Sequence, residues 1–167
     1  MTAHLRCHPL AIPVKNNKGG FLLRHMAVDA IASNDVWAVG DEGVFHYDGN
    51  VWTKDTRFSS ALFPTVTALA ARAPDDVWAG GNFGLLKHFN GQVWEDRSVA
   101  GLTDTLTSIA APSQNDVWIA SQSGIVVRWN GSGFQRHDCP ASVNGIASDG
   151  TTVRVVGQTG AILRHAP

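Results

Sequence analysis

The tetrapeptide Asp35-Val36-Trp37-Ala38 is the key to the fold of this 167-residue sequence, because it returns twice. It recurs as Asp76-Val77-Trp78-Ala79 and, with one change, as Asp116-Val117-Trp118-Ile119, at intervals of about 40 residues. A tandem period of this length is typical of repeat architectures, in which each repeat is one supersecondary unit. The repeat therefore sets the prediction for the whole chain.

Each copy of the repeat reads as four short strands, here named a to d. Strand a is a small apolar run upstream of the tetrapeptide: Val28–Ala32, Val66–Ala70, Leu106–Ala110. Strand b carries Asp-Val-Trp, strand c follows a glycine six residues after the Trp, and strand d begins with an aromatic residue. Strands c and d are joined by Asp48-Gly49, Asn90-Gly91 or Asn130-Gly131, which predicts a type I′ hairpin with positive φ at both central residues. Four antiparallel strands per repeat predict the blades of a β-propeller.

Two further copies are less complete. Val143–Ala147 and Val153–Val156 match strands a and b, and Gly20–His25 resembles Gly160–His165 as a strand c. We expect an all-β chain, one small β-propeller domain over residues 1–167, with about five four-stranded antiparallel blades, the first and last trimmed. The predicted units are residues 1–25, 26–60, 61–100, 101–138 and 139–167. Residues 1–7 either add an outer strand to the last blade, which would bring Cys7 near Cys139, or the ring closes by oligomerisation.

Composition and charge argue against several classes of protein. Apolar residues make up 44% of the chain and charged residues 16%, which argues against a disordered segment. The net charge of -1 gives no basic field for nucleic acid, and no apolar run is long enough for a transmembrane helix. The start of the chain lacks the apolar core of a signal peptide, so a cytoplasmic location is the default, and secretion by a route without a signal peptide stays open. We expect a monomer or a small homo-oligomer.

The pattern Asp-Val-Trp-Ala-Val-Gly, followed by Asp/Asn-Gly and an aromatic three residues later, resembles bacterial tandem repeats of the tectonin and Asp-box type. The resemblance covers roughly residues 26–165. It implies a propeller whose relatives bind glycans or other surface ligands, and it transfers no catalytic residue.

Candidate binding residues come from two places in the repeat. Residues of the turns between strands b and c differ from unit to unit while the strands stay alike, which favours one asymmetric ligand site. These are Asp41, Asn82, Phe83, Gln122 and Gln158. The tryptophans near the outer edge of the blades offer ring faces on which sugars stack: Trp52, Trp94 and Trp129. Trp37, Trp78 and Trp118 of strand b are expected instead to fill the gaps between blades.

Strand c carries a recurring basic residue. These residues form a row that binds an anion or an acidic sugar, a solvated row on the outer strands, or a set of ion pairs with Asp41, Asp55, Glu95 or Asp96. The row is Arg24, His46, His88, Arg128 and Arg164. The aspartates that open strand b, Asp35, Asp76 and Asp116, are expected to accept backbone N–H bonds after a turn.

No pattern of catalytic or metal-binding residues stands out. The seven histidines have no metal-ligand spacing, and there is no nucleophile elbow or phosphate-binding loop. We expect no cofactor and no enzyme activity. The favoured function is a glycan-binding, lectin-like module, with a protein–protein interaction platform as the alternative and a hydrolase or lyase as a minority hypothesis.

Overall fold

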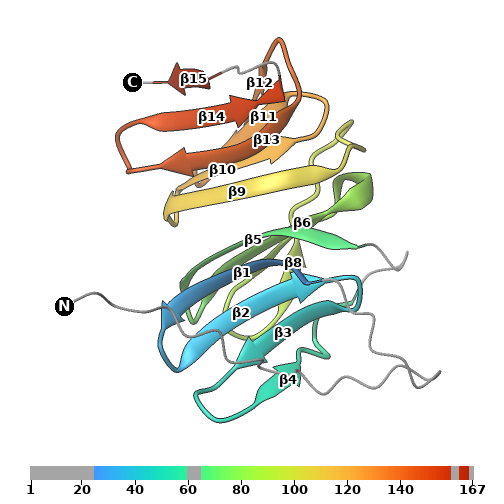
Figure 1. Ribbon diagram of the computed structural model, residues 1–167, viewed down its shortest axis with the longest axis vertical. Helices are drawn as coiled ribbons and strands as arrows, with labels where there is room; N and C mark the ends of the chain where they lie inside the picture. The colour runs from blue at the N-terminus through green and yellow to red at the C-terminus, as the bar shows by residue number, and fades with distance from the viewer. Residues whose placement is uncertain (1–24, 60–64, 159–161, 166–167) are drawn as a thin grey trace.

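The computed structural model describes residues 25–59, 65–158 and 162–165, which form antiparallel sheets joined by short turns (Figure 1). The first blade contains β1 (His25–Ala32), β2 (Asp35–Gly40), β3 (Gly43–Tyr47) and β4 (Trp52–Lys54). The second contains β5 (Val66–Ala73), β6 (Asp76–Gly81), the short 3₁₀ turn η1 (Asn82–Gly84), β7 (Leu86–Phe89) and β8 (Trp94–Asp96). The third contains β9 (Leu106–Ser113), β10 (Asp116–Ser121), β11 (Ile125–Trp129) and β12 (Phe134–Asp138). The fourth contains β13 (Val143–Ser148), β14 (Val153–Gly157) and β15 (Ile162–His165).

These sheets confirm the predicted all-β fold and its four-stranded antiparallel unit. Within each sheet the strands are hydrogen-bonded in chain order, as expected for strands a to d. The predicted first unit, apart from His25, lies outside the described residues, and so do the outer strand expected from residues 1–7 and the pairing of Cys7 with Cys139. The described part contains no helix long and apolar enough to cross a membrane.

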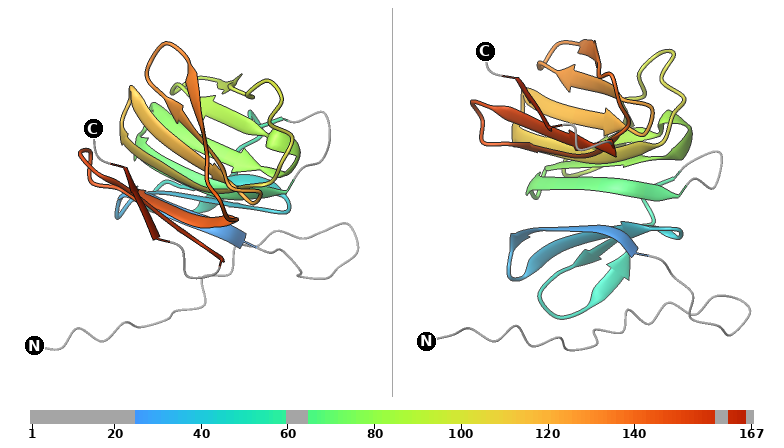
Figure 2. Two further views of the ribbon diagram at one scale, coloured as in Figure 1. Left: turned by 90° about the horizontal axis from the view of Figure 1, so that it is seen from above. Right: turned by 45° about the horizontal axis from the view of Figure 1, so that its top comes forward.

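The four described sheets stack face to face in chain order (Figure 2). The first strand of each blade is innermost: β1 packs beside β5, β5 beside β9, and β9 beside β13. Small residues make this close approach of strands feasible, and β5 alone contains four alanines. Hydrogen bonds join the neighbours, since Thr107 Oγ1 donates to Val143 O and Ile146 N donates to Ser108 Oγ.

The hydrophobic core consists of the layers between successive blades. One cluster joins the first and second blades, another the second and third, and another the third and fourth. Trp37, Trp78 and Trp118 lie in these layers and are buried, as predicted for strand b. A sheet covered on both faces needs apolar residues on both sides of each strand, which explains why strand b does not alternate apolar with polar residues.

The register of β1 corrects the alignment of the first repeat. Asp29 pairs with Trp37, whereas Ala70 and Ala110 pair with the equivalent Trp78 and Trp118. Asp29 is therefore the equivalent of Ala70, and the sequence alignment placed strand a of the first blade three residues too far along the chain. The alignment was based on small apolar residues. Because such residues recur every one or two positions in this strand, they fit both the predicted and the observed register.

The hairpins between strands c and d are correctly placed, but their turn type is not I′. Of the two central residues only the glycine has positive φ, at 93° for Gly49 and 90° for both Gly91 and Gly131. The Asp or Asn before it does not, since Phe83 is the one non-glycine residue of the described part with positive φ. The preceding Asp or Asn instead accepts two backbone N–H bonds with its side chain, as Asp48 Oδ1 does from Asn50 and Val51. The loop is four residues long because this side chain replaces a second left-handed residue.

The glycines six residues after Trp78 and Trp118 have a packing role as well as a turn role. Gly84 has φ of 68°, and a Cβ added there would lie 1.8 Å from Leu102 O in the connection to the third blade. At Gly124 the same atom would lie 2.5 Å from Ala141 O. Backbone atoms cannot move aside as a flexible side chain can, so only glycine lets the turn between strands b and c contact the next connection.

Replacement of Gly84 tests this close approach. We expect Gly84→Ala to lower the free energy of unfolding by about 3 kcal/mol, because it combines left-handed strain with a backbone clash. Gly101→Ala is the matched control: Gly101 also has positive φ but open space around it, so only about 1 kcal/mol should be lost. Urea unfolding followed by tryptophan fluorescence measures both, and equal losses would contradict the clash.

Candidate functional site

The predicted turn residues lie in the turns between strands b and c, with one such turn in each described blade and two of the residues, Asn82 and Phe83, in the second. Asp41, Gln122 and Gln158 are exposed there. Gln122 N donates to Thr105 O and Gln158 N to Ser142 O, so these turns contact the connections between blades. Asn82 and Phe83 belong to η1, where Phe83 has a left-handed backbone and is 68% exposed.

The three outer tryptophans differ in exposure. Trp94 is buried, and its Nε1 donates to Asp55 Oδ2 of the first blade. Trp129 is half-buried beneath the guanidinium of Arg97, 5.2 Å from the ring centroid. Trp52 is half-buried beside Tyr47. Trp94 and Trp129 thus contact the preceding blade, and a ring packed in this way presents little surface to a sugar.

The basic residues of strand c pair with the aspartates that open strand b. His46 Nε2 lies 2.8 Å from Asp35 Oδ1, His88 Nε2 lies 2.9 Å from Asp76 Oδ1, and Arg128 Nε lies 2.7 Å from Asp116 Oδ1. This corrects two expectations, since these aspartates accept from side chains across the sheet and the basic partners are not Asp41, Asp55, Glu95 or Asp96. The side chains of Arg24 and Arg164 lie outside the description. The row is a repeated structural clamp between adjacent strands.

Asp76 is the most enclosed of the three clamps. Its side chain is 2% exposed and accepts from Arg72 Nε at 2.6 Å, Trp78 Nε1 at 3.0 Å and His88 Nε2. Burial by itself would raise the pKa of Asp76, but the bonds from His88 and Arg72 outweigh it and hold the pKa below its usual value. The carboxylate therefore stays charged, and it fixes the guanidinium of Arg72.

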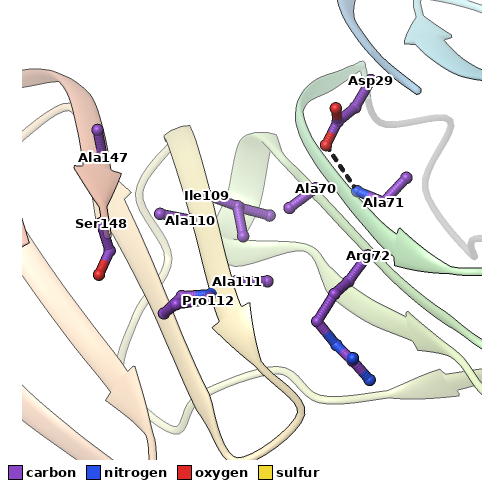
Figure 3. Close-up of a pocket in the computed structure, with 10 residues that line it drawn as sticks. All are labelled: Asp29, Ala70, Ala71, Arg72, Ile109, Ala110, Ala111, Pro112, Ala147 and Ser148. Atoms are coloured by element: carbon purple, nitrogen blue, oxygen red, sulfur yellow. Dashed lines mark hydrogen bonds between the residues drawn. The ribbon is translucent and has the colours of Figure 1, made fainter. Parts of the chain in front are cut away.

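Arg72 stands on the rim of a pocket of about 260 Å³ beside the innermost strands (Figure 3). Its walls come from all four described blades, and they are mostly small: Ala70, Ala71, Ile109, Ala110, Ala111, Pro112 and Ala147. Asp29, Ala70, Ala110 and Ala147 occupy one register position, each paired with the residue at the tryptophan position of strand b. We call this hollow the axial pocket.

The polar groups of the axial pocket are Asp29, Arg72 and Ser148. Asp29 Oδ2 accepts from Ala71 N at 2.9 Å, which joins β1 to β5, and Oδ1 accepts from Ala30 N. Both charged side chains are thus held in place, one by backbone donors and one by Asp76. The pocket offers a fixed carboxylate and a fixed guanidinium beside an apolar floor.

The geometry gives no support to a catalytic centre in the described residues. The axial pocket has a hydroxyl, Ser148, but no histidine lines it. The described part holds no cluster of three or more His, Cys, Asp or Glu side chains that suits a metal ion. Burial, together with the neighbouring Asp138, raises the pKa of the Cys139 thiol, which makes it a poor nucleophile.

A smaller crevice lies between the third and fourth blades. Asp116, Trp118, Arg128 and Thr151 are among the residues that line it, and its volume is about 50 Å³. That is room for a water molecule or two and not for a sugar ring. None of the eight predicted binding residues lines this crevice or the axial pocket.

No protein-family model and no curated protein matches the sequence. Solved structures do match. The chain is similar to the computationally designed Ika4 protein, with 20% identity and a TM-score of 0.69 over 88% of this chain and 93% of Ika4. It is similar to YCF48 bound to D1 peptide, with 16% identity and a TM-score of 0.69 over 87% of this chain and 52% of the YCF48 chain. It is also similar to the WD40 beta propeller domain of Doa1, with 16% identity and a TM-score of 0.67 over 84% of this chain and 49% of the Doa1 chain.

The chain folds as a β-propeller. It spans about half the length of the YCF48 and Doa1 chains that it matches, and nearly all of Ika4. At these identities the likeness concerns the fold alone.

Sequence reasoning missed the residues of the axial pocket. A signal was present, because Asp29 interrupts a position that is alanine in the other described blades. The shifted alignment of the first repeat hid it by placing Asp29 opposite Thr67 instead of Ala70.

The Asp76 clamp gives a stability prediction. We expect Asp76→Asn to lower the free energy of unfolding by about 3 kcal/mol, because it leaves Arg72 and His88 around a neutral side chain. Asp116→Asn removes the equivalent clamp from a site whose side chain is 19% exposed, and should cost about 1 kcal/mol. Chemical unfolding of both variants checks the order, and a larger loss at Asp116 would contradict it.

Acid should weaken the fold through the same buried carboxylates. The pKa of Asp55, like that of Asp76, is held below its usual value because bonds from Arg57 and Trp94 outweigh the effect of its burial. A depressed native pKa adds stability above the unfolded value, and this stability is lost as pH falls through the native one. The free energy of unfolding should therefore be steady near neutrality and decline below about pH 4. The decline should be shallower in Asp76→Asn, measured by urea titrations at a series of pH values.

Proposed function

We propose that this chain is a non-catalytic binding platform that takes an extended segment of a partner protein into the axial pocket. The observation that carries the proposal is the pocket itself, with a fixed Asp29 carboxylate and Arg72 guanidinium beside walls of alanine. Small side chains leave room for the side chains of a ligand, and opposite charges suit a peptide with residues of both signs.

Several features favour a peptide over a glycan. A lectin-like propeller is expected to repeat shallow pockets, each with an accessible aromatic ring. Here Trp37, Trp78 and Trp118 are buried, and no aromatic residue lines the axial pocket. The structure of YCF48 holds a D1 peptide, which supports the same class of ligand for this chain. Glycan binding remains the second ligand class to be tested.

The test is a selection from random linear peptides displayed on phage, run beside a glycan array with the same purified chain. Ala147→Phe should abolish peptide binding, because Ala147 is exposed and lines the pocket, so that a ring at this position fills it. Ala100→Phe is the matched control on an exposed alanine that does not line the pocket, and it should bind as the wild type does.

Other results would overturn this assignment. Loss of peptide binding in Phe83→Ala, with Ala147→Phe unaffected, would move the site to the turns between strands b and c. Saturable binding to related sugars, with no peptide selected, would restore the lectin hypothesis.

A further inference from the structure

Asp29 brings a negative charge into the axial pocket that the described chain does not balance. Its side chain is half-buried, and both of its hydrogen bonds come from backbone N–H groups, from Ala30 to Oδ1 and from Ala71 to Oδ2, each at 2.9 Å. Among the described residues Asp29 forms no ion pair, whereas Arg72 Nε lies 2.6 Å from Asp76 Oδ2. A carboxylate taken partly out of water without a cation costs free energy. The pocket therefore favours a ligand with a positive charge.

Blade packing does not need the carboxylate of Asp29. Ala70 and Ala110 stand at the same register position, and an alanine side chain accepts no hydrogen bond. β5 still packs beside β9, and β9 beside β13. The bonds to Asp29 thus hold the carboxylate in place without using it up, since each oxygen of an ionised carboxylate can accept more than one hydrogen bond.

The walls beside Asp29 suit an unbranched alkyl chain. Figure 3 shows Ile109, Ala110 and Ala111 of β9 in the middle of the pocket, with Asp29 to one side and Ser148 to the other. The volume of about 260 Å³ lies below the range of about 300–1,000 Å³ that encloses a whole drug-sized ligand. The pocket therefore has room for one long side chain and its adjoining backbone.

A lysine side chain combines these properties. Its alkyl stem packs along apolar surface and its tip is an ammonium group with three donors. An arginine fits less well, because a planar guanidinium binds best to both oxygens of a carboxylate at once. Both oxygens of Asp29 already accept a backbone N–H bond, which leaves a better site for a compact ammonium group.

We propose that the axial pocket recognises a lysine of the partner segment, with the ammonium group bound to the Asp29 carboxylate and the stem against Ile109 and the alanines. This inference rests on the proposed function and names the residue that anchors the segment. Arg72 does not repel the lysine, since Asp76 neutralises it, and its terminal nitrogens bind no other described residue. They are available to an oxygen atom of the same segment. Acetylation removes the charge of lysine, so the pocket reads the unmodified side chain.

Capped peptides test this anchor on the full chain. The probes are four pools of fluorescent heptapeptides with an acetylated N-terminus and an amidated C-terminus, so that no terminal charge contributes. The middle residue is lysine, norleucine, acetyl-lysine or arginine, and the other positions are randomised. By fluorescence polarisation the lysine pool should bind about 10-fold more tightly than the norleucine pool, which keeps the stem without the ammonium group. The acetyl-lysine and arginine pools should also bind more weakly.

Variants of Asp29 assign the preference to this residue. Asp29→Asn keeps the shape and removes the charge, so it should weaken binding of the lysine pool about 10-fold and leave the norleucine pool unchanged. Asp29→Ala introduces the residue that the other described blades have there and should act in the same way. Asp41→Asn is the matched control at an exposed aspartate outside the pocket, and it should bind both pools as the wild type does. Circular dichroism checks that the variants fold.

The outcomes separate this inference from the proposed function. Equal binding of the lysine and norleucine pools, both blocked by Ala147→Phe, would overturn the lysine anchor and leave the peptide platform standing. A lysine preference that persists in Asp29→Asn and Asp29→Ala would overturn the anchor as well. If no pool binds, both the anchor and the proposed function are wrong.

Discussion

The packing of one blade against the next is the contact on which the rest of this structure depends. Each described sheet is a narrow antiparallel ribbon that buries little surface alone, and the core exists only as layers between ribbons. Trp37, Trp78 and Trp118 fill these layers at one repeated position. Burying a side chain of this size removes much apolar surface from water, so a single residue per repeat can fix how successive blades approach.

The charged groups serve the same arrangement. The clamps from Asp35, Asp76 and Asp116 to strand c tie the strand that carries the tryptophan to its neighbour. Buried carboxylates persist because donors surround them, as at Asp76. The Asp76 clamp, which stabilises the second blade, also orients Arg72 at the rim of the axial pocket.

The proposed binding site arises at a position where the repeat is broken. Asp29 takes the place of an alanine at the axis, and Arg154 takes the place of a tryptophan in the last blade. In a chain of repeated blades the shared packing forms the scaffold, while a departure from it leaves a charge where the other copies have an apolar side chain.

The sequence by itself determined the all-β fold, the blade unit, the burial of the strand-b tryptophans and the positions of the hairpins. These features follow from local spacing, because each Trp and each glycine stands at the same distance from the neighbouring strands and turns in every repeat. The turn type, the partners of Asp35, Asp76 and Asp116, and the register of β1 depended on tertiary structure. An Asx side chain can replace a left-handed residue, and alanine-rich strands fit more than one alignment. Only the folded chain brings Asp29, Arg72 and Ser148 to one pocket, since three separate blades contribute them.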